Sequence, residues 1–169
     1  LIEPTGGMIQ VNGRDIRDHE PVALRRRMGY VFQGVGLFPH MTIEQNVGLV
    51  PRFLGWSPER RKHRIIALLT LVGLPSEEYA HRFPDELSGG QQQRVAVARS
   101  LANNPSVLLA DEPTGNLDSE TADAIHDIFL EMNERHGTTM LLVTHNHALA
   151  GRLARTLTLT EGVIKEDVV

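Results

Sequence analysis

The sequence of 169 residues has no cysteine, no long hydrophobic run and no excess of positive charge. The absence of cysteine excludes disulfide bonds and thiolate zinc sites. The longest apolar candidate, Ile65 to Val72, is interrupted by Thr70, and a membrane-spanning helix requires roughly 18 apolar residues. The charged side chains, 17 basic and 21 acidic, give a net charge of −4. That balance gives no indication of a nucleic-acid partner or an anionic membrane surface.

Lysine is also scarce, since Lys62 and Lys165 are the only two. The phosphate-binding loop of many nucleotide hydrolases is glycine-rich and ends in Gly-Lys followed by Ser or Thr. Arg61 precedes the first lysine and Ile164 precedes the second. This loop is therefore absent from the sequence.

The second half of the chain alternates short apolar runs with amphipathic segments. Strands are predicted at Val107–Ala110, Thr139–Val143 and Thr156–Leu159, and helices at Ser119–His136 and His147–Ala154. The first run is wholly apolar, which is typical of a strand covered on both faces. The alternation of strand and helix predicts a parallel sheet, with these three strands in it and helices on its faces.

The first half is organised differently. A weak alternation from Gly7 to Val11 precedes the turn signal Asn12-Gly13 and predicts an edge strand. Further elements are expected as a helix at Pro21–Arg26, a strand at Met28–Phe32, and helices from Ser57 to Leu71 and from Ser88 to about Asn103. The segment 34–51 has no steady period. We therefore expect a core of residues 1–33 and 100–169, with a mainly helical insert of residues 34–99.

Two adjacent carboxylates, Asp111 and Glu112, follow the apolar run Val107–Ala110. Ligands of open parallel sheets bind at the carboxyl ends of the strands. A carboxylate in that position can hold Mg²⁺, and its neighbour can orient or deprotonate an attacking water. The alternative is a pair of acids that caps the following turn.

A second motif, Ser88-Gly89-Gly90-Gln91, stands at the start of a long helix. Glycines let a ligand approach the backbone closely, and the free N–H groups of a helix N-terminus suit a phosphate. The alternative is that Ser88 is a simple N-cap.

Single polar residues follow two more of the predicted strands. His145 follows Thr139–Val143, where an imidazole could contact a terminal phosphate, and Gln33 follows Met28–Phe32. An amide can bind both Mg²⁺ and a water molecule. Either residue by itself is weak evidence.

Taken in order, these motifs resemble those of the ABC-type ATPases. The order is Gln33, then Leu87 to Gln91, then Asp111-Glu112, then Asn116-Leu117-Asp118, then His145. The resemblance runs from end to end and implies an α/β fold. It would be a P-loop NTPase-like (RecA-like) parallel sheet flanked by helices, with the ABC-type helical subdomain inserted.

The resemblance also implies roles at the hydrolytic site. Glu112 corresponds to the general base, His145 to the switch histidine, and Asp111 to the aspartate of the Mg²⁺ site. Gln33 corresponds to the glutamine that links the core to the helical insert, as a ligand of the metal and of the attacking water. ATP and Mg²⁺ are the expected cofactors.

In that family, two subunits sandwich two ATP molecules head to tail. The resemblance implies that Ser88, Gly89, Gly90 and Gln91 face the γ-phosphate held by the opposite subunit, and that Asp118 belongs to a loop crossing the interface. Besides this second subunit, the expected partners are transmembrane permease subunits. If the transporter is an importer, a periplasmic substrate-binding protein is a further expected partner. The expected location is peripheral, on the cytoplasmic face of the inner or plasma membrane.

The family's phosphate-binding loop has no counterpart here. Leu1 to Thr5 resembles the segment just after the loop-bearing helix, and the first residue is not Met. We therefore expect the loop, its strand, most of the antiparallel part and an adenine-stacking aromatic to lie upstream, and this chain alone to be inactive. A degenerate subunit that does not hydrolyse ATP is the alternative.

Two parts of the sequence resemble ATPases of transporters that move different substrates. Leu1 to Thr5 and Gly36 to Thr42 resemble ATPases of quaternary-amine (osmoprotectant) importers. Ala110 to Asp118 resembles ATPases of lipoprotein-releasing and macrolide-export systems. Import is favoured because the insert meets the membrane partner. A nucleotide-sensing module that does not hydrolyse ATP is the alternative of another class, and the presence of Glu112 and His145 argues against it.

Overall fold

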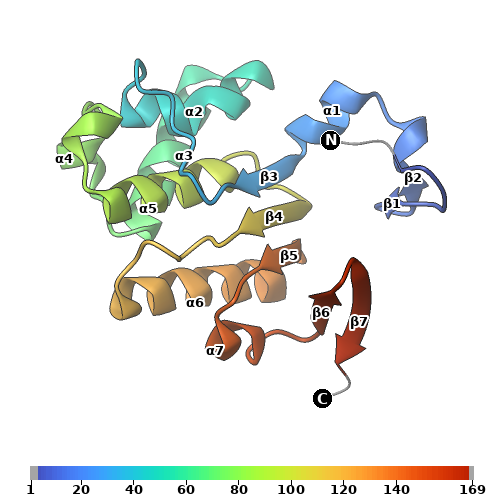
Figure 1. Cartoon of the computed structure of the whole chain (residues 1–169). Helices are drawn as coiled ribbons and strands as arrows, with labels where there is room; N and C mark the ends of the chain where they lie inside the picture. The colour runs from blue at the N-terminus through green and yellow to red at the C-terminus, as the bar shows by residue number, and fades with distance from the viewer. Residues whose placement is uncertain (1–3, 168–169) are drawn as a thin grey trace.

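A computed structural model describes residues 4–167 as a small parallel sheet surrounded by helices and two hairpins (Figure 1). The helices are α1 (Pro21–Arg26), α2 (Ile43–Phe53), α3 (Pro58–Leu71), α4 (Ser76–Tyr79), α5 (Gly89–Ser100), α6 (Ser119–His136) and α7 (His147–Ala150), with 3-10 turns at Ile16–Asp18 and Pro84–Glu86. The strands are β1 (Gln10–Val11), β2 (Arg14–Asp15), β3 (Met28–Val31), β4 (Val107–Asp111), β5 (Thr139–Val143), β6 (Thr156–Thr160) and β7 (Val163–Asp167).

The central sheet has the order β3-β4-β5, and both pairs are parallel. Val31 is paired with Ala110, and Ala110 with Leu142. The two crossovers run in the same direction across the sheet. Right-handed crossovers then bring α5 and α6 to the same face, as expected for parallel strands joined through helices. The predicted α/β architecture is confirmed.

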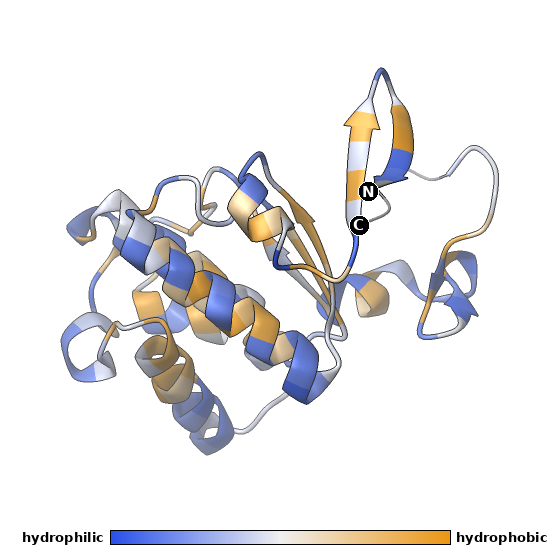
Figure 2. Ribbon diagram, turned by 90° about the horizontal axis from the view of Figure 1, so that it is seen from below, coloured by the Kyte–Doolittle hydropathy of each residue, from blue (hydrophilic) through white to orange (hydrophobic). Residues whose placement is uncertain are grey.

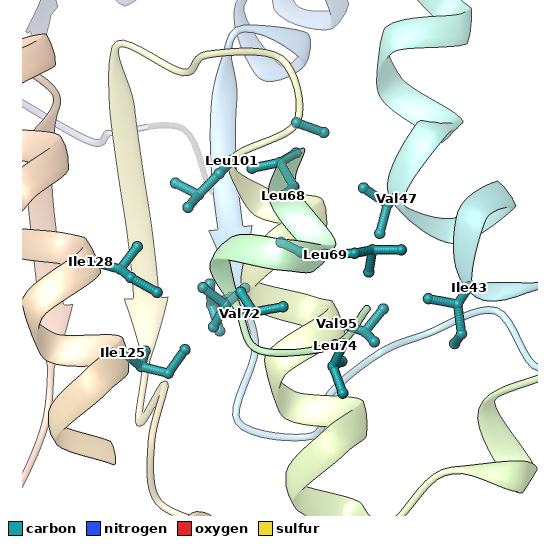
Figure 3. Close-up of a cluster of buried hydrophobic side chains, with 14 of the residues drawn as sticks. Ile43, Val47, Leu68, Leu69, Val72, Leu74, Val95, Leu101, Ile125 and Ile128 are labelled. Carbon is teal, nitrogen blue, oxygen red and sulfur yellow. The ribbon is translucent and has the colours of Figure 1, made fainter. Parts of the chain in front are cut away.

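One face of this sheet forms the core. Its side chains Val31, Leu108 and Ala110 are buried in one cluster with residues of α2, α3, α5 and α6. Figure 3 shows Ile125 and Ile128 of α6 directed towards β4, while Val47 and Leu69 lie beside Val95 in another part of the cluster. The buried residues of α3 (Leu68 and Leu69) and of α6 (among them Ile125 and Phe129) lie on one side of each helix.

Close contact between β3 and α5 depends on Gly29. A Cβ atom at Gly29 would lie 2.5 Å from the Ser100 carbonyl oxygen and 2.8 Å from Leu108 Cδ1. Real Cβ atoms do not approach other atoms so closely, so only glycine allows this spacing. The glycine thereby fixes the depth at which α5 packs on the sheet.

The opposite face of the sheet is open. Tyr30, Leu109 and Leu141 lie on it at paired positions, flanked by Phe32 and Val143. The side chains of Leu141 and Val143 are more than half exposed, at 55% and 57%. Figure 2 shows hydrophobic residues, drawn in orange, along strands of the sheet. On β4 itself, Val107 and Leu109 are half-buried, so among the described residues the predicted cover of Val107–Ala110 is complete on one face only. The wholly apolar sequence of this strand suits a strand with two covers.

The predicted third strand of the sheet is also corrected. β6 does form where the sequence indicated it, but it pairs with β7 in an antiparallel hairpin. Among residues 4–167, no strand pairs with the outer edge of β5. Leu157 and Leu159 on β6 remain exposed. An apolar edge strand and an apolar hairpin are surfaces that normally require a further strand or cover.

Helix α2 begins within the segment 34–51, which has no steady hydrophobic period in the sequence. Thr42 and Gln45 form a reciprocal capping box at its start, with Gln45 N–H to Thr42 Oγ1 at 3.3 Å and Thr42 N–H to Gln45 Oε1 at 2.9 Å. Gly48 and Pro51 lie inside the helix and obscured its pattern. By contrast, α7 ends at Ala150, four residues before the predicted end.

The N-terminal hairpin β1–β2 turns at Asn12-Gly13 as predicted, although its strands contain two residues each. The resemblance noted for Leu1 to Thr5 rests partly on residues 1–3, which lie outside the described residues. Within residues 4–167, no helix is both long enough and apolar enough to cross a bilayer.

Two buried polar contacts hold the segment between β4 and α6. The Gln93 side-chain amide donates to the Pro113 carbonyl at 2.8 Å. His126 Nε2 lies 2.9 Å from Thr114 Oγ1, with both residues buried. Burial lowers the pKa of His126, against the weaker opposing effect of Asp123, so the neutral imidazole is favoured in the folded chain.

This contact predicts an acid-sensitive contribution to stability. In the unfolded chain histidine titrates near pH 6.5, so that state binds the proton more readily than the folded one. The free energy of unfolding should therefore fall as the pH drops below about 6.5. Denaturant unfolding at several pH values would measure the fall. The variant His126→Gln keeps a hydrogen-bonding side chain and does not titrate, so it should lose stability less steeply. Equal pH dependence in both proteins would contradict the prediction.

Candidate functional site

The site begins where the three parallel strands end. Asp111 is paired with Val143, and Val31 lies in register with Ala110 and Leu142. The residues that follow, Gln33, Glu112 and His145, therefore leave the same edge of the sheet (Figure 1). Because this edge is the carboxyl end of every strand, it is where open parallel sheets bind their ligands.

Glu112 is the best-anchored residue at this edge. Its Oε1 atom accepts a hydrogen bond from the backbone N–H of His145 at 2.7 Å and lies 2.7 Å from His145 Nδ1. Its Oε2 atom accepts a hydrogen bond from the Thr144 hydroxyl at 3.1 Å. The Glu112 side chain is 16% exposed, whereas that of His145 is 87% exposed. The carboxylate is thus fixed in direction while the imidazole faces solvent.

The backbone of Glu112 is strained. Its φ is 45°, in the left-handed region that glycine favours, and such a conformation costs on the order of 1 kcal/mol for other residues. The Glu112 N–H extends the ladder to β5 by donating to the Val143 carbonyl at 2.9 Å, and the Glu112 carbonyl accepts from Gly115 N–H at 3.2 Å. Strain of this kind persists only when neighbouring bonds hold it, and it aims the side chain across the ends of β4 and β5.

Asp111 ends β4 and Gln33 follows β3, so both lie with Glu112 at this edge of the sheet. Both are exposed, and within residues 4–167 neither side chain has a hydrogen bond to another residue. Carboxylate and amide oxygens are the ligands that Mg²⁺ prefers. The chemistry of these two donors therefore suits this metal, and within residues 4–167 no three His, Cys, Asp or Glu side chains form a group that could hold a metal ion.

Ser88 caps helix α5, as the alternative interpretation of its motif predicted. The Gln91 N–H donates to Ser88 Oγ at 3.3 Å, and the Ser88 N–H donates to Gln91 Oε1 at 2.9 Å. A Cβ atom at Gly89 would meet nothing within 4 Å, whereas one at Gly90 would lie 3.4 Å from Leu117 Cδ2. Capping does not exclude binding, because the exposed first turn keeps the positive end of the helix dipole.

Asp118 is engaged in local structure. Its carboxylate accepts hydrogen bonds from the Thr121 N–H at 2.9 Å and the Thr121 hydroxyl at 2.8 Å, so it is the N-cap of α6. The backbone bond from Thr121, and then the hydroxyl bond, lower the pKa of Asp118. The resemblance assigned Asp118 to a loop crossing the interface, and this cap was not predicted, although Asp directly before a long helix is a recognised N-cap signal.

Two contacting residues were missed from the sequence. Thr144 donates to Glu112, and its hydroxyl also accepts from the Asn146 N–H at 3.0 Å. Gln93 reaches the residue that follows Glu112. Thr144 could have been found because it directly follows the apolar strand β5, one position before His145. Gln93 gave no signal, since its partner is a backbone carbonyl 20 residues away.

Comparison with known proteins gives consistent matches. A family model described as ABC transporter matches residues 1–115. The glycine betaine/carnitine/choline transport ATP-binding protein OpuCA of Bacillus subtilis is 49% identical over 154 residues, covering 91% of this chain and 40% of the relative. The macrolide export ATP-binding/permease protein MacB of Syntrophobacter fumaroxidans is 43% identical over 173 residues, covering 99% of this chain and 24% of the relative.

A solved structure matches as well. The dimeric structure of the ATP-binding cassette MJ0796, in a post-hydrolysis state bound to ADP and Pi, superimposes with a TM-score of 0.86 at 35% identity. The match covers 98% of this chain and 75% of that one. The chain spans about two fifths of the length of curated relatives such as OpuCA. With the family model matching most of its residues and the same fold in a solved cassette, the chain belongs to the ABC transporter family.

Proposed function

We propose that this chain supplies the hydrolytic sheet edge of an ATPase subunit that powers an ABC-type transporter. The observation that carries the proposal is Glu112, whose strained backbone and three hydrogen-bond donors hold its carboxylate in one direction. A carboxylate fixed in this way suits a general base that takes a proton from an attacking water.

The other residues at the edge have supporting roles in this proposal. His145 lies against Glu112 and exposes the rest of its ring to solvent, where it can contact a terminal phosphate. Asp111 and Gln33 would hold Mg²⁺, which when bound neutralises charge on the transferred phosphoryl group. Gln33 also suits contact with the attacking water through its amide.

The residues of this chain do not supply a cradle for the other phosphates. Neither Lys62 nor Lys165 follows a glycine. We propose that the cradle comes with a segment that covers the open face and pairs with the outer edge of β5. The exposed apolar side chains Leu141 and Val143 on that face support this view, because burying them is favourable. A degenerate subunit remains the alternative.

A second copy of the subunit is the proposed partner at Ser88. The first turn of α5, with Ser88, Gly89, Gly90 and Gln91, lies at the start of a helix that does not carry Glu112. Its free N–H groups suit the γ-phosphate of a nucleotide held by the other copy. Asp118, beside Leu117 and Gly90, would then lie near the interface.

The helical segment offers a docking groove for a membrane subunit. A groove of about 900 Å³ lies between α2, α3 and α4. Its apolar lining includes Leu49 and Ile65, with Glu44 and Glu77 among its acids and Arg61 among its bases. Such a lining suits a short amphipathic segment of a permease, which would place the chain at the cytoplasmic face of the membrane.

Import of a quaternary amine is the proposed transport function. Relatives with the names glycine betaine/carnitine/choline transport and osmoprotectant import ATP-binding proteins support it. A periplasmic substrate-binding protein would then be a further partner. The match to a macrolide export protein supports export as the second candidate. A nucleotide sensor without hydrolysis is the candidate of another class.

The role of Glu112 predicts a large loss of activity on removal of its charge. In a longer protein that supplies the phosphate-binding segment, Glu112→Gln should lower kcat for ATP hydrolysis at least about a hundredfold, the typical contribution of a general base. The KM for ATP should change little. The matched control is Glu134→Gln, an exposed glutamate on α6, which should keep the wild-type rate. A wild-type protein that binds ATP without hydrolysing it would favour the sensor.

The missing cradle predicts weak nucleotide binding by these 169 residues alone. Titration calorimetry with Mg-ATP should give a Kd weaker than roughly 1 mM, corresponding to less than about 4 kcal/mol of binding free energy. The physical reason is the lack of the lysine and of the nest of backbone amides that bind the β- and γ-phosphates. A micromolar Kd would overturn this part of the proposal.

A further inference from the structure

Arg99 in the last turn of α5 contacts the loop that follows Gln33. Its Nη1 donates to the Gly36 carbonyl at 2.7 Å, and its Nη2 lies 3.3 Å from the Val35 carbonyl, to which it also donates. The guanidinium carbon lies 6.0 Å from the centre of the Phe38 ring. These contacts connect residues more than 60 positions apart in the sequence.

The guanidinium of Arg99 is partly buried without a counter-charge. No ion pair joins it to an acidic side chain in the part of the chain that the structure describes. Burial lowers the pKa of Arg99. Removing a cation from water is costly unless hydrogen bonds replace its hydration. The two backbone carbonyls and the face of Phe38 are the groups that replace it.

The loop that Arg99 holds has an unfavourable conformation. Val35 and Gly36 both have positive φ, of 46° and 60°. A β-branched residue such as valine is a rare outlier there, so local preference does not explain the shape of the loop. The two carbonyls that Arg99 binds belong to these same two residues. Arg99 is therefore placed to stabilise the turn that directs Gln33 onto the sheet edge.

Helix α5 connects these contacts of Arg99 with the loop to the Ser88 motif. Ser88 and Arg99 are 11 positions apart, which corresponds to about 16 Å along a helix. Between them Val95, Ala96, Val97 and Ala98 are fully buried. A helix packed in this way moves as one piece, since interiors are closely packed and resist deformation.

We propose that Arg99 is a positioning residue that couples the two ends of α5, so that a displacement of the Ser88 end is transmitted to the Gln33 loop. Together with the proposed function, this links the Gln33 of one nucleotide site to the nucleotide held by the other copy. The effect on catalysis rests on the proposed function, whereas the hold of Arg99 on the Gln33 loop rests on the structure alone.

Arg94 provides a matched control on the same helix. Its Nη1 donates to the carbonyls of Val72 and Gly73, both at 3.1 Å. Arg94 thus binds two backbone carbonyls as Arg99 does, but those of the turn between α3 and α4. Replacing either arginine removes one positive charge and similar hydrogen bonds from α5, and only one of them touches the Gln33 loop.

The stabilisation of the loop by Arg99 is tested in the 169-residue chain by amide hydrogen exchange. Arg99→Gln should raise the exchange rate of peptides covering residues 33–38 about tenfold, which corresponds to about 1.4 kcal/mol. Arg94→Gln should leave those peptides unchanged, and Arg99→Lys should give an intermediate rate because lysine keeps the charge without the fork. If peptides covering residues 33–38 exchange equally fast in wild type, Arg99→Gln and Arg99→Lys, Arg99 does not stabilise this loop.

The positioning role is tested by ATP hydrolysis in the longer protein. Arg99→Gln should lower kcat about tenfold with KM for ATP within about twofold, and Arg94→Gln should match wild type, at equal thermal stability of the two variants. Faster exchange with unchanged kcat would overturn the positioning role and leave a structural one. If wild type does not hydrolyse ATP, the proposed function fails, while the exchange experiment still decides whether Arg99 holds the loop.

Discussion

The parallel register of β3, β4 and β5 is the constraint on which the rest of the structure depends. It makes three strands end together, and each chain segment that leaves the sheet carries a polar residue: Gln33, Asp111-Glu112 or Thr144-His145. Because the ladder continues from Val143 to the Glu112 N–H, the same hydrogen bonds that build the sheet bring Glu112 next to His145. Strand pairing therefore brings the residues of the candidate site to one edge.

The helices around this edge hold its loops by polar contacts to the backbone. Gln93 and Arg99 on α5 bind carbonyls on either side, one after Glu112 and one after Gln33. His126 on α6 binds Thr114 within the buried layer. Backbone carbonyls offer no side-chain specificity, but fixing them fixes the direction of the residues between. The position of α5 and the positions of the loops at the sheet edge therefore depend on the same hydrogen bonds.

Sequence patterns predicted the parts that depend on local chemistry. Apolar runs followed by polar residues identified Gln33, Asp111 and His145 at strand ends, and the helix predicted at Ser119–His136 has the bounds of α6. The partners of these residues could not be predicted, because they depend on packing between distant segments. The open face and the contacts of Arg99 follow from tertiary arrangement. The pairing of β6 with β7 is a local hairpin that turns at Glu161-Gly162, and it was not predicted. Helix α2 was missed because Gly48 and Pro51 interrupt its helical pattern, although Thr42 and Gln45 form a capping box at its start.

The most direct test of convergence on one edge is Mn²⁺ titration of the isotopically labelled chain, observed by nuclear magnetic resonance. Mn²⁺ accepts the oxygen ligands that suit Mg²⁺ and broadens signals of nearby nuclei. The account predicts that signals of Gln33, Asp111, Glu112 and His145 broaden together at the lowest metal concentration, and that Asp111→Asn removes this effect. Broadening that begins at unrelated acidic residues, with these four unaffected, would contradict it.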